Sequence, residues 1–242
     1  MGTPTRPPSA WNGIVGIVFD AVGTLIRPEP SVADAYAATA ARQGVRLAPE
    51  VVRARFQVHF AKDEVRGNGG ALSTDEATEQ RRWRNIVAGV LPEIPGLDRA
   101  FDELWEHFST PGSWRCFPDV APALLALSAQ GVAVCIGSNF DGRLRRVVSG
   151  LPELADCVDS LVISSEVGFR KPHPSFFRAA CARLGLPPER VLCVGDDVEN
   201  DVQGAIRAGL SGILLDRAAL APSDLPHVPN LTALIQSKLA GT

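Results

Sequence analysis

Four short segments of the chain place reactive side chains directly after apolar runs. In chain order they carry Asp20 and Thr24, Ser138 and Asn139, Lys171, and Asp196 and Asp201. Three converging carboxylates would hold a hard cation such as Mg²⁺, which prefers oxygen ligands. A carboxylate can attack an anionic phosphoryl group if positive charge neutralises both partners. We therefore expect Asp20 to be a nucleophile, with Lys171 and the cation supplying that charge and Ser138 donating a hydrogen bond to the same oxygens.

The segments lie on a chain that alternates between strand-like and helical patterns. Apolar runs predict strands at about 13–19, 132–136, 160–164, 191–194 and 213–215, and helices are expected at 119–129, 174–184 and 200–208. Such alternation gives a parallel sheet covered on both faces, with ligands at the carboxyl ends of its strands. The predicted fold class is α/β, with a doubly wound, Rossmann-like parallel sheet.

The first strand is followed by a long stretch, 28–112, without a strand pattern. Helices are expected there at about 31–43, 49–61, 74–90 and 97–108, with Ser31 and Thr74 as caps and a flexible turn at 67–70. We therefore predict an α/β core of 12–27 and 113–242, interrupted by a helical cap of 28–112. In the tail, Asn230 is expected to cap a short final helix.

The composition is that of an ordinary globular protein, with 45% hydrophobic and 21% charged residues and a net charge of −3. Neither nucleic acid nor membrane is an expected partner, because the chain lacks a basic excess and a long apolar run. The basic clusters at 81–84 and 143–146 are interpreted as solvated helix faces. Five cysteines without a C-x-x-C pair favour a reducing, cytoplasmic setting. The expected partner is a small-molecule substrate, and the oligomeric state is not indicated.

Taken together and in this order, the four segments resemble the motifs of the haloacid dehalogenase-like superfamily, over residues 13–216. Each segment alone has an ordinary explanation, such as a helix cap at Asp20 or Asp201 or a surface turn at Lys171. However, the chain has only three lysines, and one of them falls at the family's lysine position. The resemblance implies an early helical cap over the site. It also implies that Asp20, Asp196, Asp201 and the backbone carbonyl of Val22 bind Mg²⁺, that Thr24 and Asn139 orient their neighbours, and that Gly23 and Asn139 lie beside the substrate.

Position 22 departs from the family's phosphatases, which have a second aspartate two residues after the nucleophile. Val22 cannot transfer a proton, whereas an acid–base residue at this position typically contributes about 10²–10⁴-fold to the rate. One interpretation is a phosphatase for esters with good leaving groups, or one that uses another acid–base residue from the cap. The sequence does not show which of Arg53, Arg55, Lys62 or Trp83 faces the site.

Three other interpretations remain. Phosphonatases of the superfamily also have a small apolar residue at this position, and they use a cap lysine as a Schiff base, for which Lys62 is the candidate. Dehalogenation is disfavoured, because the acidic fourth segment would repel a haloacid. The third is a regulatory protein without catalysis, although such a protein would not need the nucleophile. We therefore predict a Mg²⁺-dependent, phosphatase-type hydrolase that acts on a small phosphorylated metabolite.

Overall fold

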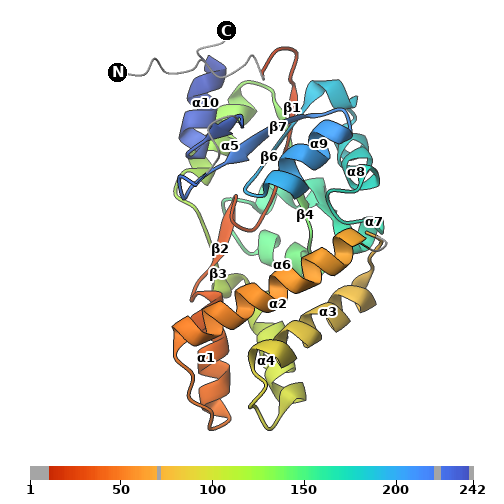
Figure 1. Cartoon of the computed structure of the whole chain (residues 1–242). Helices are drawn as coiled ribbons and strands as arrows, with labels where there is room; N and C mark the ends of the chain where they lie inside the picture. The colour runs from red at the N-terminus through yellow and green to blue at the C-terminus, as the bar shows by residue number, and fades with distance from the viewer. Residues whose placement is uncertain (1–10, 70–71, 221–224, 240–242) are drawn as a thin grey trace.

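A parallel sheet with helices on both faces lies above a group of four helices, as viewed in Figure 1. The structure is a computed structural model that describes residues 11–69, 72–220 and 225–239. The four helices lie beyond the carboxyl ends of the strands, which is the edge where the reactive segments were expected.

Six strands form the sheet in the order β5-β4-β1-β6-β7-β8, and all neighbouring strands run parallel. In chain order the strands are β1 (Gly16–Phe19), β4 (Ala133–Ser138), β5 (Leu161–Ile163), β6 (Val191–Gly195), β7 (Ser211–Leu215) and β8 (His227–Val228). The first five confirm the predicted strands and the α/β fold class. β8 was not predicted, because a strand of two residues is too short to show a periodic pattern.

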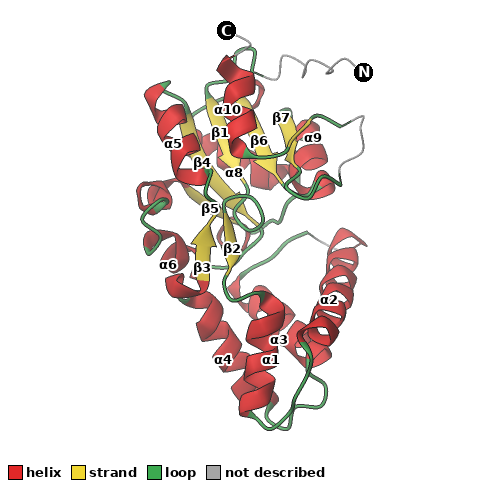
Figure 2. Ribbon diagram, turned by 90° about the vertical axis from the view of Figure 1, so that its left-hand side faces the viewer, coloured by secondary structure: helices red, strands yellow, loops and turns green. Residues whose placement is uncertain are grey.

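Successive residues of β1 point to opposite faces of the sheet, and both faces are covered. Ile17 and Phe19 pack in a cluster with α5 (Val120–Ala129), α6 (Arg143–Ser149) and α10 (Leu231–Leu239). Val18 packs in a second cluster with α8 (Pro174–Leu184) and α9 (Gly204–Arg207). Figure 2 shows the sheet between these two layers. Burial on both faces explains why the first strand is a continuous apolar run rather than an alternating one.

The cap consists of α1 (Val32–Arg42), α2 (Pro49–Gly69), α3 (Glu76–Val90) and α4 (Leu97–Ser109), and it has a hydrophobic cluster of its own. Two predicted caps are confirmed: Ser31 Oγ accepts a hydrogen bond from the Asp34 amide, and Asn230 Oδ1 accepts one from the Ala233 amide. The division at 27/28 and 112/113 remains a proposal.

Two details of the predicted cap are wrong. α2 continues to Gly69, through most of the turn predicted at 67–70, because a glycine costs a propagating helix only about 1 kcal/mol; residue 70 lies outside the described residues. Asp75, and not Thr74, caps α3 by accepting from the Thr78 amide. Thr74 Oγ1 instead donates to the buried Glu79 carboxylate, at 2.7 Å.

The cap is joined to the core by a two-stranded antiparallel link, β2 (Ile26–Pro28) and β3 (Trp114–Cys116), which was not predicted. The α2–α3 connection also contacts the core, because the Arg170 amide donates to Leu72 O and the Thr74 amide donates to Gly168 O. α7 (Ser164–Val167), the 3₁₀ segments Pro111–Ser113, Ala155–Ser160 and Pro188–Arg190, and the π-helix Val198–Gln203 complete the elements of the described chain. In the described residues, no helix has the length and apolar character needed to cross a membrane.

Candidate active site

Asp20 lies directly after β1, the strand that β4 and β6 flank in the sheet. Its amide donates to Val194 O at 2.9 Å, which continues the ladder with β6, and the residue is 7% exposed. The strand ends of β4 and β6 bring Ser138 and Asp196 to the same edge. The parallel register therefore brings Asp20 together with two side chains that lie more than 100 residues from it in the sequence.

Lys171 holds two of the carboxylates. Its Nζ donates to Asp20 Oδ1 at 2.7 Å, to Asp201 Oδ1 at 2.6 Å and to the Gly137 carbonyl at 3.0 Å, and the side chain is almost completely buried. Burial would lower the pKa of Lys171, but the charges of Asp20 and Asp201 outweigh this effect and raise the pKa above its ordinary value. Lys171 is therefore a permanently charged group at this site.

Asp20, Asp196 and Asp201 each place a carboxylate oxygen within 4.8 Å of the others. Burial, followed by repulsion from Asp20 and Asp201, raises the pKa of Asp196 to about 8, although this residue still reaches solvent. Burial is also the main cause that raises the pKa of Asp201 to about 6, against the opposing charge of Lys171. A single lysine thus leaves the cluster with excess negative charge, and an all-oxygen donor set of this kind fits a hard divalent cation.

The loop after Asp20 is built closely against Asp196. Gly23 has φ +91, and a Cβ at this position would lie 2.1 Å from Asp196 Oδ2, so both the backbone conformation and the space require glycine. Val22 lines the cavity beside the carboxylates. Thr24 is fully buried, and no partner within the described residues bonds its hydroxyl, so the orienting role expected for that hydroxyl stays a prediction.

Asn139 fixes the loop that carries Lys171. Its Nδ2 donates to Lys171 O at 3.0 Å, and its Oδ1 accepts from the Lys171 amide at 2.7 Å. Both polar groups of the amide are therefore used by the backbone, which supports orientation of Lys171 over a direct bond to substrate. Asn139 and Ser138 nevertheless both line the cavity.

The fourth segment forms a π-helix, Val198–Gln203, immediately after β6. Asp197 caps it, because its Oδ1 accepts from the amides of Glu199 and Asn200. Asp201 Oδ2 accepts from the Asp197 amide, so this helix turns the Asp201 carboxylate back toward Lys171. Asp201 is thus an inward-facing member of the cluster rather than the helix cap.

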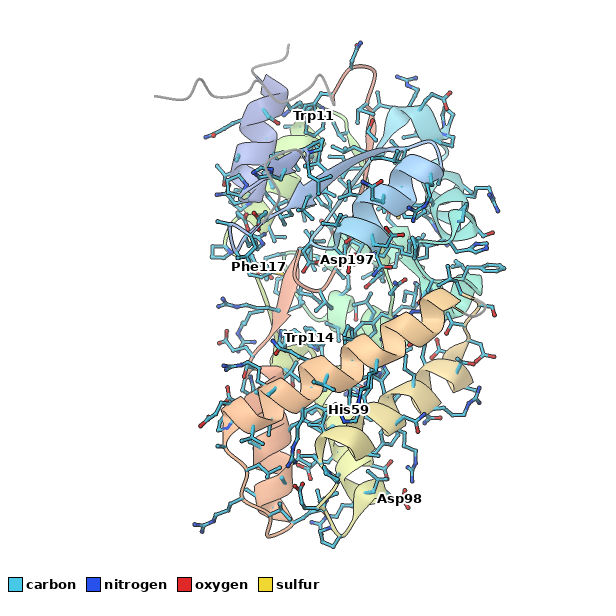
Figure 3. The ribbon with its side chains drawn as sticks, viewed as in Figure 1. Trp11, His59, Asp98, Trp114, Phe117 and Asp197 are labelled. Carbon is cyan, nitrogen blue, oxygen red and sulfur yellow. The ribbon has the colours of Figure 1, made fainter. Side chains whose placement is uncertain are left out.

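A cavity of about 360 Å³ lies between the core and the cap. Its core side carries the polar residues Asp20, Ser138, Lys171, Asp196 and Asp201, and the cap adds Arg82. The remainder is mainly apolar and comes largely from the cap; its aromatic members are Tyr36, Phe56, Phe60, Trp83, Phe108, Trp114 and Phe140. Figure 3 labels Asp197 and Trp114, which lie near the level where core and cap meet.

Two arginines at the cavity contradict the interpretation of their sequence clusters as solvated faces. The Arg143 side chain is 10% exposed, donates to both oxygens of the fully buried Asp141 at 2.7 Å, and stacks 3.4 Å above the Trp105 ring centroid. The Arg82 side chain is 6% exposed and lies over Phe60 and Trp83. Arg81, Arg84, Arg145 and Arg146 retain substantial exposure. Asp141, two residues before Arg143, was a local sequence signal for Arg143, whereas Trp83 is adjacent to both the buried Arg82 and the more exposed Arg84.

The structure also decides which of the four named cap residues faces the site. Trp83 lines the cavity, whereas Lys62 and Arg53 are exposed. Arg55 pairs with Glu93, at 2.7 Å. The ion pair between Arg217 and Asp119 was not predicted from the sequence. Arg217 also donates to Thr24 O at 2.9 Å and thereby fixes the loop that follows Asp20.

Comparisons with known proteins agree with this geometry. The chain is 29% identical to haloacid dehalogenase-like hydrolase domain-containing protein 3 of Mus musculus, over 90% of this chain and 91% of the relative. It is 34% identical to a phosphoserine phosphatase of Thermus thermophilus, over 60% of this chain and 59% of the relative. The crystal structure of L-2-haloacid dehalogenase from Xanthobacter autotrophicus has a TM-score of 0.69 at 22% identity, over 92% of this chain and 97% of that chain, which shows a shared fold.

The family description that matches the chain is a haloacid dehalogenase-like hydrolase, over residues 14–209. The matched residues include all four segments that carry the candidate site. The chain therefore belongs to the haloacid dehalogenase-like hydrolase family.

Proposed function

We propose that the protein is a Mg²⁺-dependent phosphatase-type hydrolase in which Asp20 is the nucleophile. The observation that carries this proposal is the pair of short hydrogen bonds from Lys171 to Asp20 and Asp201, beside a third carboxylate at Asp196. A cation held by Asp20, Asp196, Asp201 and the Val22 carbonyl would supply the positive charge that a phosphoryl group and a carboxylate need in order to meet. The phosphatase names among the relatives support the reaction class.

The chain's own residues can perform a two-step transfer. Asp20 lies at the floor of the cavity, with one oxygen held by Lys171, so the other can approach a phosphorus atom. Lys171 and the Ser138 hydroxyl would contact the non-bridging oxygens of the phosphoryl group as their charge grows. Water then hydrolyses the covalent aspartyl-phosphate and restores Asp20.

The alternatives fit the geometry less well. A Schiff-base lysine requires burial to lower its pKa, but Lys62 is exposed, which disfavours carbon–phosphorus cleavage. The fold likeness to dehalogenases carries no information on the reaction, and the carboxylates that crowd this site would repel a haloacid. A purely regulatory role would leave the buried nucleophile and its lysine without a purpose.

The test is a turnover assay with and without Mg²⁺ against acetyl phosphate, nitrophenyl phosphate, phosphonoacetaldehyde and 2-chloropropionate. We expect phosphate release that requires Mg²⁺ and disappears in Asp20→Asn. Asp156→Asn, a change at an exposed aspartate outside the cavity, is the matched control and should retain activity. Turnover of one of the last two compounds alone would replace the proposal, and Mg²⁺ binding without any turnover would favour a regulator.

A further inference from the structure

We propose that the phosphate ester cleaved at this site has an aromatic leaving group, an inference that rests on the function proposed above. Two independent features of the chain lead to it. One is the cap-side wall of the cavity, where aromatic side chains predominate beside Pro28, Val32 and Arg82. The other is position 22, where the chain has no group that can protonate a leaving oxygen.

The cavity concentrates the aromatic residues of the whole chain. The sequence has 10 Phe, 4 Trp and one Tyr, and seven of these residues line this one cavity. Successive rings contact one another with centroids 5.5 to 6.4 Å apart, in the order Trp83, Phe60, Phe56, Tyr36, Phe108 and Trp114. Trp114 in turn contacts Phe140, the neighbour of Asn139. A continuous aromatic band therefore extends from the cap to the edge of the phosphoryl site.

The band suits a flat apolar group better than a polyol or a nucleotide sugar. Rings that are offset-stacked or edge-to-face gain about 0.5–1.5 kcal/mol beyond the area that they bury, and an aromatic occupant of this cavity would lie beside several such rings. The volume of about 360 Å³ lies at the small end of the ~300–1,000 Å³ typical for ligand cavities, which limits the occupant to about one or two rings beside the phosphate.

The second feature concerns the bond that breaks. Val22 lines the cavity but has no proton to give, so position 22 provides no acid that would neutralise the leaving oxygen as it departs. A phenol has a pKa of about 10, well below the pKa of water and of the aliphatic alcohols that leave from alkyl esters, so phenolate is the better leaving group. An aryl ester therefore needs the missing acid far less than an alkyl ester does. The same substrate class thus satisfies both the wall and position 22.

The proposed reaction balances without a further reagent. An Asp20 oxygen bonds to phosphorus as the bond from phosphorus to the aryl oxygen breaks, and the electron pair leaves with that oxygen as phenolate. The phenolate takes a proton from solvent. Water then bonds to phosphorus, the bond from phosphorus to Asp20 breaks, and the water's proton passes to solvent, which yields inorganic phosphate and the original carboxylate.

Three phosphate compounds separate the two features experimentally. Phenyl phosphate has the ring and the better leaving group, benzyl phosphate has the ring with an alkoxide leaving group, and acetyl phosphate has a good leaving group without a ring. We expect phenyl phosphate to have a kcat/KM at least tenfold above those of benzyl phosphate and glycerol phosphate. Benzyl phosphate should inhibit competitively, and acetyl phosphate should turn over with a higher KM than phenyl phosphate.

A cap variant tests the wall itself. Phe60→Leu should lower the ratio of kcat/KM for 1-naphthyl phosphate to that for acetyl phosphate by about three- to tenfold. Phe101→Leu makes the same change within the same cap cluster but outside the cavity, and it should leave this ratio at the parent value. Melting curves of both variants establish that each is folded before the ratios are compared.

The outcomes distinguish this inference from the proposed function. Turnover of acetyl phosphate together with an equal or greater kcat/KM for glycerol or sugar phosphates would overturn the aromatic leaving group and leave the hydrolase intact. An unchanged ratio in folded Phe60→Leu would do the same. Failure of every phosphate compound with Mg²⁺ present would instead overturn the hydrolase itself.

Discussion

Replacing Lys171 by Met removes the charge that two buried carboxylates share. The methionine keeps the length of the side chain but leaves Asp20 and Asp201 without their hydrogen bonds of 2.7 and 2.6 Å. Removal of one partner from a buried ion pair typically costs about 3–5 kcal/mol. For a protein of this size, about 1 kcal/mol lowers Tm by about 2–4 °C, so we expect a decrease of about 6–20 °C.

The loss of stability in Lys171→Met should be larger at high pH than at low pH. Even with Lys171 present, the pKa values of Asp196 and Asp201 are raised to about 8 and about 6. Between about pH 4 and the raised pKa of each residue, the folded protein therefore binds more protons than the unfolded chain. Stability from this cluster therefore falls as pH rises. Without Lys171 the carboxylates can lower their repulsion only by binding protons, so the variant should lose more at pH 8 than at pH 5.

The assay is thermal unfolding by circular dichroism in EDTA at pH 5 and pH 8. Lys62→Met, which removes an exposed lysine from α2, is the matched control and should change Tm by about 2 °C or less. A Lys171→Met variant that melts within 3 °C of the parent at pH 8 would refute the interpretation that this ammonium group compensates the carboxylates.

Three further predictions concern the proton, the cation and the loop. Val22→Asp should raise kcat for glycerol phosphate by about 10²-fold or more, and a Val22→Asn control should not; equal rates in both would mean that another group already supplies the proton. The affinity for Mg²⁺, measured by isothermal titration calorimetry, should increase from pH 5.5 to pH 8.5, because protons on Asp196 and Asp201 compete with the cation; a pH-independent affinity would contradict the assigned ligands. Asn139→Leu removes both side-chain hydrogen bonds to the Lys171 backbone and should lower kcat about tenfold or more with a smaller change in KM; an unchanged kcat would show that Asn139 does not position Lys171.

Much of this architecture could be predicted because buried strands and motif order are local properties of the sequence. The runs that end at Phe19 and Val194 identified the central strands, and parallel pairing then placed Asp20 and Asp196 at one edge. The strands of the β2–β3 link and β8 are only two or three residues long, so they carry no recognisable period.

The rest depends on tertiary packing. Asp141 is a local partner of the buried Arg143, but the Trp105 ring that covers Arg143 and leaves Arg146 exposed comes from the cap and cannot be placed from the sequence. The aromatic band likewise joins rings from α1, α2, α3 and α4 to β3, elements that the sequence cannot place relative to one another. The sequence therefore predicted the end of the cavity that carries the carboxylates and Lys171, and the structure was needed for the aromatic end.

The central claim is that Asp20 attacks phosphorus, and rapid acid quench of the reaction with nitrophenyl phosphate tests it most directly. Because Val22 cannot activate water, the second step should be the slower one, and the aspartyl-phosphate should accumulate. The account predicts a Mg²⁺-dependent burst of nitrophenolate, about one equivalent per enzyme, with the phosphoryl group on the peptide that contains Asp20. Steady turnover with no phosphoryl group on that peptide, or with the group on another residue, would contradict it.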